Sequence, residues 1–257
     1  MNDLFSLKGR TALITGGSRG IGKMIAAGFI THGARVYISS RKAAVCEQAA
    51  KGLSKNGGTC VALPMDSSTV AGARALAAAY RAQEPKLDIL VNNAGAAWLE
   101  KFTEFPEKGW DKVMDLNVKT PFFLTQALMG ALSAAGTKDR PSKVINVASI
   151  DGIAVNPQET YSYAASKAGL IHLTKRMAVR MIQDNIAMSA IAPGAFASEM
   201  NVDARDNGDE VKKRIPAQRI GRDEDMAGAA IFLASKAGDY VVGATLVVDG
   251  GVSLMRL

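Results

Sequence analysis

The sequence predicts an α/β protein of the doubly wound kind, with a seven-stranded parallel sheet flanked by helices in a single domain. Three observations predict it. Short apolar runs alternate with longer amphipathic runs over nearly the whole chain, which is the pattern of successive strand–helix–strand units. Most of the short runs are apolar throughout, as expected of strands covered on both faces. A glycine-rich turn joins the first apolar run to the first amphipathic run, and no linker-like stretch divides the 257 residues.

The predicted strands are the short runs rich in β-branched or apolar residues: 11–15, 35–39, 59–63, 87–91, 143–148, 186–191 and 245–248. The predicted helices are the amphipathic runs between them: 22–32, 43–54, 70–83, 107–117, 121–135, 161–183 and 223–233. The stretch 195–217 does not fit the alternation, because it is polar and rich in Asp and Lys. We expect a mobile insertion there, over the substrate side of the sheet edge, which could contain a short helix.

Composition narrows the class of protein. Hydrophobic residues make up 48% of the chain and charged residues 21%, which excludes a disordered chain. We expect no membrane span, because no apolar run approaches roughly 18 residues, and the first residues do not resemble a secretory signal. Two cysteines without metal-ligand spacing, Cys46 and Cys60, favour a reducing cytoplasm and no metal site. The net charge of +7 comes from scattered basic residues, so we expect no nucleic-acid partner.

A glycine-rich loop follows the first predicted strand and opens the first predicted helix. Its residues 15–22 read T-G-G-S-R-G-I-G. Gly16, Gly20 and Gly22 let the backbone turn tightly and approach a pyrophosphate, and the helix N-terminus offers free N–H groups to it. The order strand–loop–helix predicts a dinucleotide site, although the glycine spacing differs from the commoner G-x-G-x-x-G. The alternative is a glycine-rich turn with no ligand.

The end of the second predicted strand indicates which dinucleotide is bound. An NAD site usually has an acidic residue there, but residues 38–42 read I-S-S-R-K, with no acid. Arg41 is placed to hold a 2′-phosphate by two charge-assisted hydrogen bonds, and Arg19 in the glycine-rich loop is a second cation on the same side. We therefore predict NADP(H) in preference to NAD(H). The alternative is that both arginines are ordinary surface residues.

The predicted helix 161–183 carries a tyrosine and a lysine four residues apart. At about 100° per residue, Tyr163 and Lys167 project from one face, whereas Tyr161 lies about 240° from Lys167. An ammonium beside a phenol favours the phenolate and lowers its pKa from about 10, so the pair is suited to acid–base chemistry. Ser149 follows the strand 143–148 at the sheet edge where ligands bind. The alternatives are an amphipathic helix with a core Tyr and a surface Lys, and a Ser that caps a turn.

Taken in order, these residues resemble the motifs of the classical short-chain dehydrogenase/reductase family over essentially the full length. The matching positions are 15–22, Asp66, 88–95 (D-I-L-V-N-N-A-G), Asn117, Ser149, 163–167 (Y-A-A-S-K), 193–194 and 248–251 (V-D-G-G). The resemblance implies a single Rossmann-type domain over residues 1–257 and an NAD(P)-dependent oxidoreductase that acts on CH–OH groups. Within the family, the pattern is most similar to bacterial 3-oxoacyl reductases and gluconate-type dehydrogenases.

The resemblance also implies a role for each matching residue. Tyr163 would be the general acid in reduction, Lys167 would lower its pKa and hold the nicotinamide ribose, and Ser149 would polarise the carbonyl. Asn117 would hold a water that links Lys167 to solvent. Ser198 stands where the family usually has a threonine that touches the carboxamide. The cofactor is expected to contact Gly16, Ser18, Arg19, Gly20, Ile21, Gly22, Ser40, Arg41, Asp66, Ser67, Asn93, Ala94, Gly95, Tyr163, Lys167, Pro193, Gly194 and Ser198.

The activity implied by the resemblance is NADPH-dependent reduction of a ketone, with 3-oxoacyl thioesters as the first choice of substrate. Polyol, sugar-acid and steroid alcohol dehydrogenases are the alternatives. A dinucleotide-binding protein without catalysis is the least favoured hypothesis, because Tyr163 and Lys167 are both present. A cytoplasmic homotetramer is implied as well, built from the helices 121–135 and 161–183 and the C-terminal strand region.

The chain departs from the family pattern at two places, the substrate-facing loop 151–160 and Ser189, and it carries one aromatic residue directly after a family motif. Fourteen positions separate Ser149 from Tyr163, one more than in many members, so the loop 151–160 absorbs an extra residue. Ser189 stands where the family often has Asn. Trp98 follows the segment 92–95 directly and either lines the substrate cleft or serves in packing.

Overall fold

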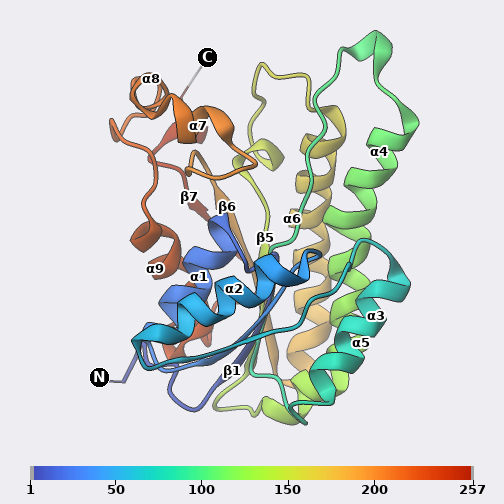
Figure 1. Ribbon diagram of the computed structural model, residues 1–257, viewed down its shortest axis with the longest axis vertical. Coiled ribbons are helices and arrows are strands. Elements are labelled where there is room, and N and C mark those ends of the chain that lie inside the picture. Colours follow the sequence, from blue (N-terminus) through green and yellow to red (C-terminus); the bar gives the residue numbers. More distant parts are fainter. Residues whose placement is uncertain (1–2, 256–257) are drawn as a thin grey trace.

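Seven parallel strands form one sheet in the computed structural model, which describes residues 3–255, for residue 56 the backbone alone (Figure 1). The strands are β1 (Thr11–Thr15), β2 (Arg35–Ser39), β3 (Thr59–Ala62), β4 (Ile89–Asn92), β5 (Ser142–Val147), β6 (Ile186–Pro193) and β7 (Thr245–Val248). They lie in the order β3-β2-β1-β4-β5-β6-β7. The winding direction reverses between β1 and β4, and such a reversal opens a crevice for ligands at the carboxyl ends of the strands.

All seven predicted strands are confirmed, and those predicted at 11–15, 35–39 and 245–248 have the predicted bounds. The other four differ by one or two residues at one or both ends, and backbone hydrogen bonds explain two of these differences. Ala192 and Pro193 pair with β7, which lengthens β6 beyond the predicted end at residue 191. Leu87 donates its backbone N–H to Ala131 instead of a strand, so β4 begins later than predicted.

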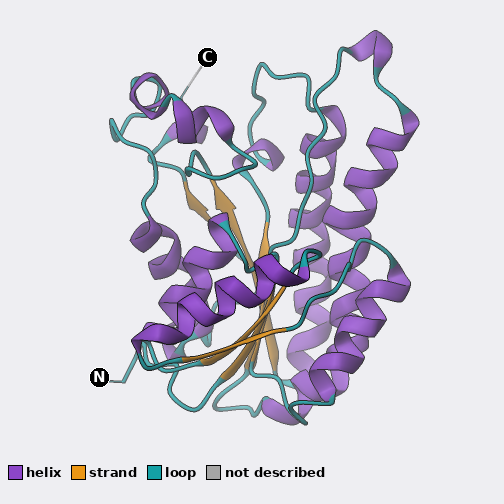
Figure 2. Ribbon diagram, viewed as in Figure 1, coloured by secondary structure: helices purple, strands orange, loops and turns teal. Residues whose placement is uncertain are grey.

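Helices cover both faces of the sheet (Figure 2). They are α1 (Gly20–Thr31), α2 (Ala43–Leu53), α3 (Val70–Arg81), α4 (Glu107–Met114), α5 (Thr120–Ala135), α6 (Tyr161–Met181), α7 (Val202–Asp206), α8 (Gly208–Lys212) and α9 (Asp223–Ala234). Side chains of α1, α2 and α9 pack in one core with Ile14, and those of α3, α5 and α6 pack in a second core with Leu13. Because neighbouring residues of a strand point to opposite faces, β1 contributes to both cores.

The helix predicted at 107–117 is shorter in the structure. α4 ends at Met114, and a π-helical turn over Asp115–Lys119 leads into α5, where the N–H of Thr120 donates to the carbonyl oxygen of Asp115. Pro121 follows directly and has no N–H to donate, so the regular hydrogen-bond ladder cannot run through this point. Asn117 lies within the turn, and π-helical turns often occur at functional positions.

The segment 195–217 contains two short helices, α7 and α8, where the sequence suggested one. Phe196, Ala204 and Ile215 are buried and anchor it. Phe196 also forms a β-bridge with Gly221. In Figure 1 this segment lies above the carboxyl ends of β6 and β7, on the side of the sheet edge where the sequence placed it. Its mobility stays a prediction.

Within residues 3–255, every helix falls short of the length or the apolar character needed to cross a lipid bilayer.

Candidate active site

Ser149, Tyr163 and Lys167 come together beside the carboxyl end of β5. The Ser149 hydroxyl lies close enough to the Tyr163 phenol to lower its pKa. The Nζ atom of Lys167 lies 5.5 Å from the centre of the Tyr163 ring and donates a 2.8 Å hydrogen bond to the carbonyl oxygen of Val147. Ser149 and Lys167 are buried. The structure therefore brings together the three residues that the sequence selected, in a site largely closed to water.

Tyr161 faces away from this site, as the helical spacing predicts. It is 38% exposed, and its hydroxyl donates to a carboxylate oxygen of Glu159 at 3.0 Å. Its ring packs edge-on against Phe102 and Phe105. Tyr161 is therefore not placed to share the role assigned to Tyr163.

Burial dominates the ionisation of the Tyr–Lys pair. It raises the pKa of Tyr163 to about 12 and lowers the pKa of Lys167 to about 8, because both charged forms lose their water. The hydrogen bond from Ser149 acts in the opposite direction and lowers the Tyr163 pKa. The prediction of a lowered Tyr163 pKa is therefore wrong for this structure, since the effect of burial outweighs that of Ser149. The phenol keeps its proton at neutral pH, which suits a group that donates a proton.

Asn117 connects the loop after β4 to α6. Its Oδ1 accepts the N–H of Ala96 at 2.8 Å, and its Nδ2 donates to the Ala96 carbonyl and to Ser166 Oγ, each at 2.9 Å. Ser166 Oγ in turn donates to the carbonyl oxygen of Tyr163 at 2.7 Å. The sequence analysis did not single out Ser166, although its place between Tyr163 and Lys167 was a signal. Asn117 thus fixes the turn of α6 that carries both side chains, and its binding of a water stays a prediction.

The glycine-rich loop is closely packed between β1 and α1. Gly16 and Gly20 have positive φ angles of 65° and 51°, which other residues rarely adopt. A Cβ atom on Gly22 would lie 2.4 Å from the carbonyl oxygen of Gly16. The Nδ2 atom of Asn93 donates to the carbonyl oxygens of Thr15 and Gly16 at 2.9 and 3.2 Å, so it braces the loop.

The N-terminus of α1 is open to an anion. Arg19 precedes the helix in an extended conformation, and no side chain caps it. The first N–H groups of a helix have no partners within it, and with the helix dipole they favour a phosphate. Ser18 is buried in the loop, and Ile21 packs against the core beneath it. These features suit the pyrophosphate predicted from the sequence.

Ser40 and Arg41 fit a 2′-phosphate group at the end of β2. The Ser40 Oγ atom is shielded from solvent and has no hydrogen-bond partner within the described residues. Arg41 is exposed, and within the same residues it makes neither an ion pair nor a side-chain hydrogen bond. An unpartnered hydroxyl beside a free guanidinium matches the needs of a phosphate dianion.

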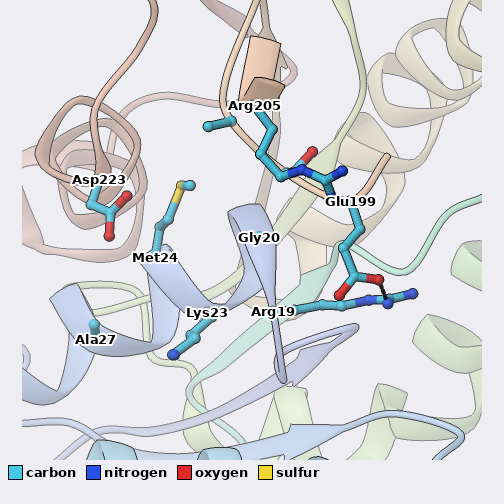
Figure 3. Close-up of a pocket in the computed structure, with 10 residues that line it drawn as sticks. Arg19, Gly20, Lys23, Met24, Ala27, Glu199, Arg205 and Asp223 are labelled. Atoms are coloured by element: carbon cyan, nitrogen blue, oxygen red, sulfur yellow. Dashed lines mark ion pairs between the residues drawn. The ribbon is translucent and has the colours of Figure 1, made fainter. Parts of the chain in front are cut away.

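Arg19 is engaged differently from the prediction. It forms an ion pair with Glu199, a residue that the sequence analysis did not select (Figure 3). The pair borders a cavity of about 320 Å³ between α1 and the segment 195–217, whose lining also includes Gly20, Lys23 and Ser198. A 2′-phosphate contact from Arg19 would require it to leave Glu199.

The remaining predicted cofactor residues lie along the same edge of the sheet. Asp66 is exposed after β3, and its carboxylate accepts the N–H of Ser68 at 3.0 Å. Ser67 is buried, and its carbonyl accepts the hydroxyl of Thr120 at 2.7 Å. Ala94 donates its N–H to Thr15 Oγ1 at 3.0 Å. These contacts fix the backbone after β3 and β4 at the edge of the crevice.

The residues predicted around the nicotinamide also have defined places. A Cβ atom on Gly95 would lie 3.2 Å from Asn117 Oδ1 and 3.7 Å from Lys167 Nζ, so Gly95 keeps space beside the lysine. Pro193 ends β6, and Gly194 donates its N–H to Val248 at 3.0 Å. Ser198 accepts the N–H of Asn201 at 3.1 Å.

Trp98 packs on α4, in line with one of the two interpretations that the sequence left open, and a place in the substrate cleft stays a prediction. A Cβ atom on Gly109 would lie 2.7 Å from its ring, so the indole rests directly on α4. The Nζ atom of Lys112 lies 5.4 Å from the ring centre, in a cation–π contact. Trp98 thereby attaches the loop after β4 to α4.

Comparison with known proteins links the chain to one group of enzymes. Residues 16–253 match the family model described as enoyl-(acyl carrier protein) reductase. The chain is 43% identical over 257 residues to the rhamnolipids biosynthesis 3-oxoacyl-[acyl-carrier-protein] reductase of Pseudomonas aeruginosa, covering 99% of this chain and 100% of that protein. It is 37% identical over 255 residues to the 5-keto-D-gluconate 5-reductase of Escherichia coli K12, with 98% of each chain covered.

Solved structures agree with this grouping. The Pseudomonas aeruginosa RhlG/NADP active-site complex superposes with a TM-score of 0.94 at 42% identity, covering 98% of this chain and 100% of that one. A gluconate 5-dehydrogenase from Burkholderia cenocepacia, in complex with NADP and tartrate, superposes with a TM-score of 0.90 at 35% identity, covering 99% of each chain.

Proposed function

Because the chain belongs to the short-chain dehydrogenase/reductase family of oxidoreductases, which act on CH–OH groups, we propose that it is an NADPH-dependent carbonyl reductase. One observation carries this proposal: the Tyr163 phenol lies beside the Ser149 hydroxyl, and the Nζ atom of Lys167 lies 5.5 Å from the centre of its ring, at the carboxyl edge of the sheet. This group of side chains can bind a carbonyl oxygen and give it a proton.

The side chains divide the reaction between them. When bound, the nicotinamide cofactor would supply a hydride for the carbonyl carbon. Ser149 Oγ accepts the N–H of Asp151 at 3.1 Å, which leaves its own proton to donate to the substrate oxygen. Tyr163 gives its proton to the same oxygen as negative charge develops there. Lys167 holds the ribose hydroxyls and returns a proton to Tyr163 by way of water near Asn117.

The proposed cofactor is NADP(H). Ser40 and Arg41 would hold the 2′-phosphate, and the unpartnered Ser40 hydroxyl supports that assignment. NADP is also the cofactor named in the two structures compared above. The other contacts follow the order of the site: the loop 16–22 at the pyrophosphate, Asp66 and Ser67 at the adenine, 93–95 along the trough, and Pro193, Gly194 and Ser198 at the nicotinamide.

A 3-oxoacyl thioester is the proposed substrate, supported by the 43% identity to a 3-oxoacyl-[acyl-carrier-protein] reductase. Reduction of an oxo sugar acid is the second candidate, because relatives at 37% identity carry that activity in their names. The two candidates share the same chemistry at the carbonyl and differ in the charge of the substrate.

The assembly and location are part of the same proposal. We propose a cytoplasmic homotetramer of one-domain chains, with the segment 195–217 moving over the substrate. Exposed apolar side chains support an assembly: Val179 on α6 is 64% exposed and Val247 on the edge strand β7 is 39% exposed. Cys46 and Cys60 are both free thiols, which accords with a reducing compartment. Sedimentation velocity would measure the mass of the assembly.

The proposed function is tested by NADPH oxidation with a short 3-oxoacyl thioester. Tyr163→Phe removes the proton donor and keeps the ring, so kcat should fall about 10²–10⁴-fold while NADPH still binds. The matched control is Tyr161→Phe, which removes the same hydroxyl from the opposite face of α6 and should change kcat little. Equal turnover by wild type and Tyr163→Phe would remove Tyr163 as the acid.

A further inference from the structure

Asp151 is a charged residue beside the active site. Its backbone N–H contacts Ser149, but its carboxylate has no role in the proposed reaction. It lies in the short 3₁₀ turn Ile150–Gly152 that follows Ser149, and its backbone N–H donates to Ser149 Oγ at 3.1 Å. Its side chain is half-buried. Within residues 3–255 its carboxylate makes neither an ion pair nor a side-chain hydrogen bond. The carboxylate oxygens therefore remain available to interact with whatever enters the site.

The turn that carries Asp151 is held firmly against α6. A Cβ atom on Gly152 would lie 2.6 Å from the carbonyl carbon of Lys167 and 2.7 Å from the backbone nitrogen of Ala168. The absence of a side chain at Gly152 therefore allows backbone to rest on backbone. The contact fixes Asp151 relative to both Tyr163 and Lys167.

The charge of Asp151 reaches the reacting groups. It raises the pKa of the Tyr163 phenol, after the larger effect of burial, and it also raises the pKa of Lys167 against the effect of burial. Among the charged side chains of the described residues, Asp151 is the one whose charge shifts the pKa of both Tyr163 and Lys167. Because Tyr163 must contact the substrate oxygen, a substrate bound there also interacts electrostatically with the Asp151 carboxylate.

We infer that Asp151 is a specificity-determining residue, whose carboxylate makes the site favour ketones that are uncharged near the carbonyl over ketones that carry a carboxylate there. This inference rests on the proposed reductase function and deepens it. A thioester carries no charge next to its 3-oxo group, whereas an oxo acid brings a second negative charge into a site shielded from water. Like charges brought together in such a site repel strongly.

The test compares two ketones of nearly equal shape, a 4-oxocarboxylate and its amide, in NADPH oxidation. Wild type should favour the amide in kcat/KM. Asp151→Asn keeps the size of the side chain and removes its charge, so it should raise kcat/KM for the oxocarboxylate about tenfold and change that for the amide little. An unchanged ratio of the two kcat/KM values would overturn the inference.

Two control variants separate charge at this position from other effects. Asp151→Glu retains the charge and should keep the wild-type preference. Glu159→Gln removes one negative charge from the same loop, at a side chain that binds Tyr161 on the opposite face of α6, and should also keep it. An equal shift in Glu159→Gln would mean that net charge, and not the position of Asp151, sets the preference.

The pH profile gives a second readout that a purely structural role would not move. In the oxidation direction Tyr163 must lose its proton, so the rate rises with pH. Asp151→Asn removes a charge that disfavours the phenolate, and the rising limb should move to lower pH. If Asp151→Asn alters the substrate preference and leaves the rising limb of the pH profile in place, Asp151 acts on the charge of the substrate and not on the ionisation of Tyr163.

Failure of the inference and failure of the proposed function give different results. Loss of the proposed function appears as no turnover of any ketone, or as turnover that survives Tyr163→Phe. In that case the binding of the same two ketones, read from the fluorescence of bound NADPH, should show the same preference for the amide and its loss in Asp151→Asn. Equal binding of both ketones by wild type would overturn the inference independently of catalysis.

Discussion

Arg19 and Arg41 border the same crevice but have different partners in the structure. Both were selected from the sequence as partners of a 2′-phosphate. In the structure Arg41 remains exposed at the end of β2, whereas Arg19 forms an ion pair with Glu199 on the segment 195–217. An exposed ion pair is weak, commonly about 0–1 kcal/mol, so a phosphate dianion could displace Glu199. Arg41 needs no such exchange and therefore carries the cofactor assignment.

Arg41→Asp tests that assignment. The new carboxylate would repel a 2′-phosphate and could accept a hydrogen bond from the 2′-hydroxyl of NADH. We expect the affinity for NADPH to fall about 10–100-fold, which corresponds to the loss of charge-assisted hydrogen bonds, while the affinity for NADH is kept or improved. Dissociation constants measured by fluorescence titration check this. Arg81→Asp makes the same change at the far end of α3 and should leave both affinities unchanged; an unchanged NADPH preference in Arg41→Asp would remove Arg41 from the site.

At the scale of elements, the junction between β1 and α1 depends on the absence of a side chain at Gly22. A methyl group there would press on the carbonyl oxygen of Gly16 from only 2.4 Å. The same methyl group would lie 2.5 Å from Asn93 Nδ2, which donates to that carbonyl, so the loop has little room to give way. The N-terminus of α1 therefore reaches its place only with glycine at this position.

Gly22→Ala should weaken NADPH binding about tenfold or more, because overpacking of about 1–3 kcal/mol must be relieved by moving the loop. Calorimetric titration with NADPH measures this. The matched control is Gly52→Ala in α2, where a Cβ atom would meet nothing within 4 Å. That variant should bind NADPH normally and be up to about 1 kcal/mol more stable, since alanine favours the helix. Normal NADPH affinity in Gly22→Ala would show that the loop adapts.

A largely buried ion pair connects β5, near the middle of the sheet, to the segment that leads into the last strand, β7. Lys143 in β5 lies 2.8 Å from an Oδ1 atom of Asp239, which precedes β7, and their side chains are 2% and 22% exposed. Burial lowers the pKa of Lys143, and Asp239 counteracts that effect. The pair attaches the chain that leads into β7 to the edge of the sheet opposite the active site.

Because Lys143 is more buried than Asp239, we expect variants at the two positions to lose different amounts of stability. Asp239→Asn leaves an ammonium buried without its partner and should lower the free energy of unfolding by about 3 kcal/mol. Lys143→Met leaves a carboxylate that water can still reach, so its cost should be smaller. The double variant should recover part of the loss, because neither charge remains. Urea denaturation measures all three; equal losses in both single variants would show that the pair is not desolvated as the exposures indicate.

Local sequence patterns were enough to predict the strands, the glycine-rich loop and the face of α6 that carries Tyr163 and Lys167. These follow from local rules, namely the period of apolar residues, the conformational freedom of glycine and the turn of a helix. The contacts that set the ends of strands, such as the donation of Leu87 to Ala131 in α5, come from segments distant in the sequence and shift the bounds by one or two residues.

Four features of the site could not be predicted from local patterns: the pairing of Arg19 with Glu199, the packing of Trp98 on α4, the position of Asp151 against α6 and the raised pKa of Tyr163. Each depends on segments that are distant in the sequence and on how much water their packing removes. Local patterns record which groups are present and which way an element turns. They do not record the distances and the burial that set the strength of charges, and for that reason the electrostatics of this site could be obtained only from the folded chain.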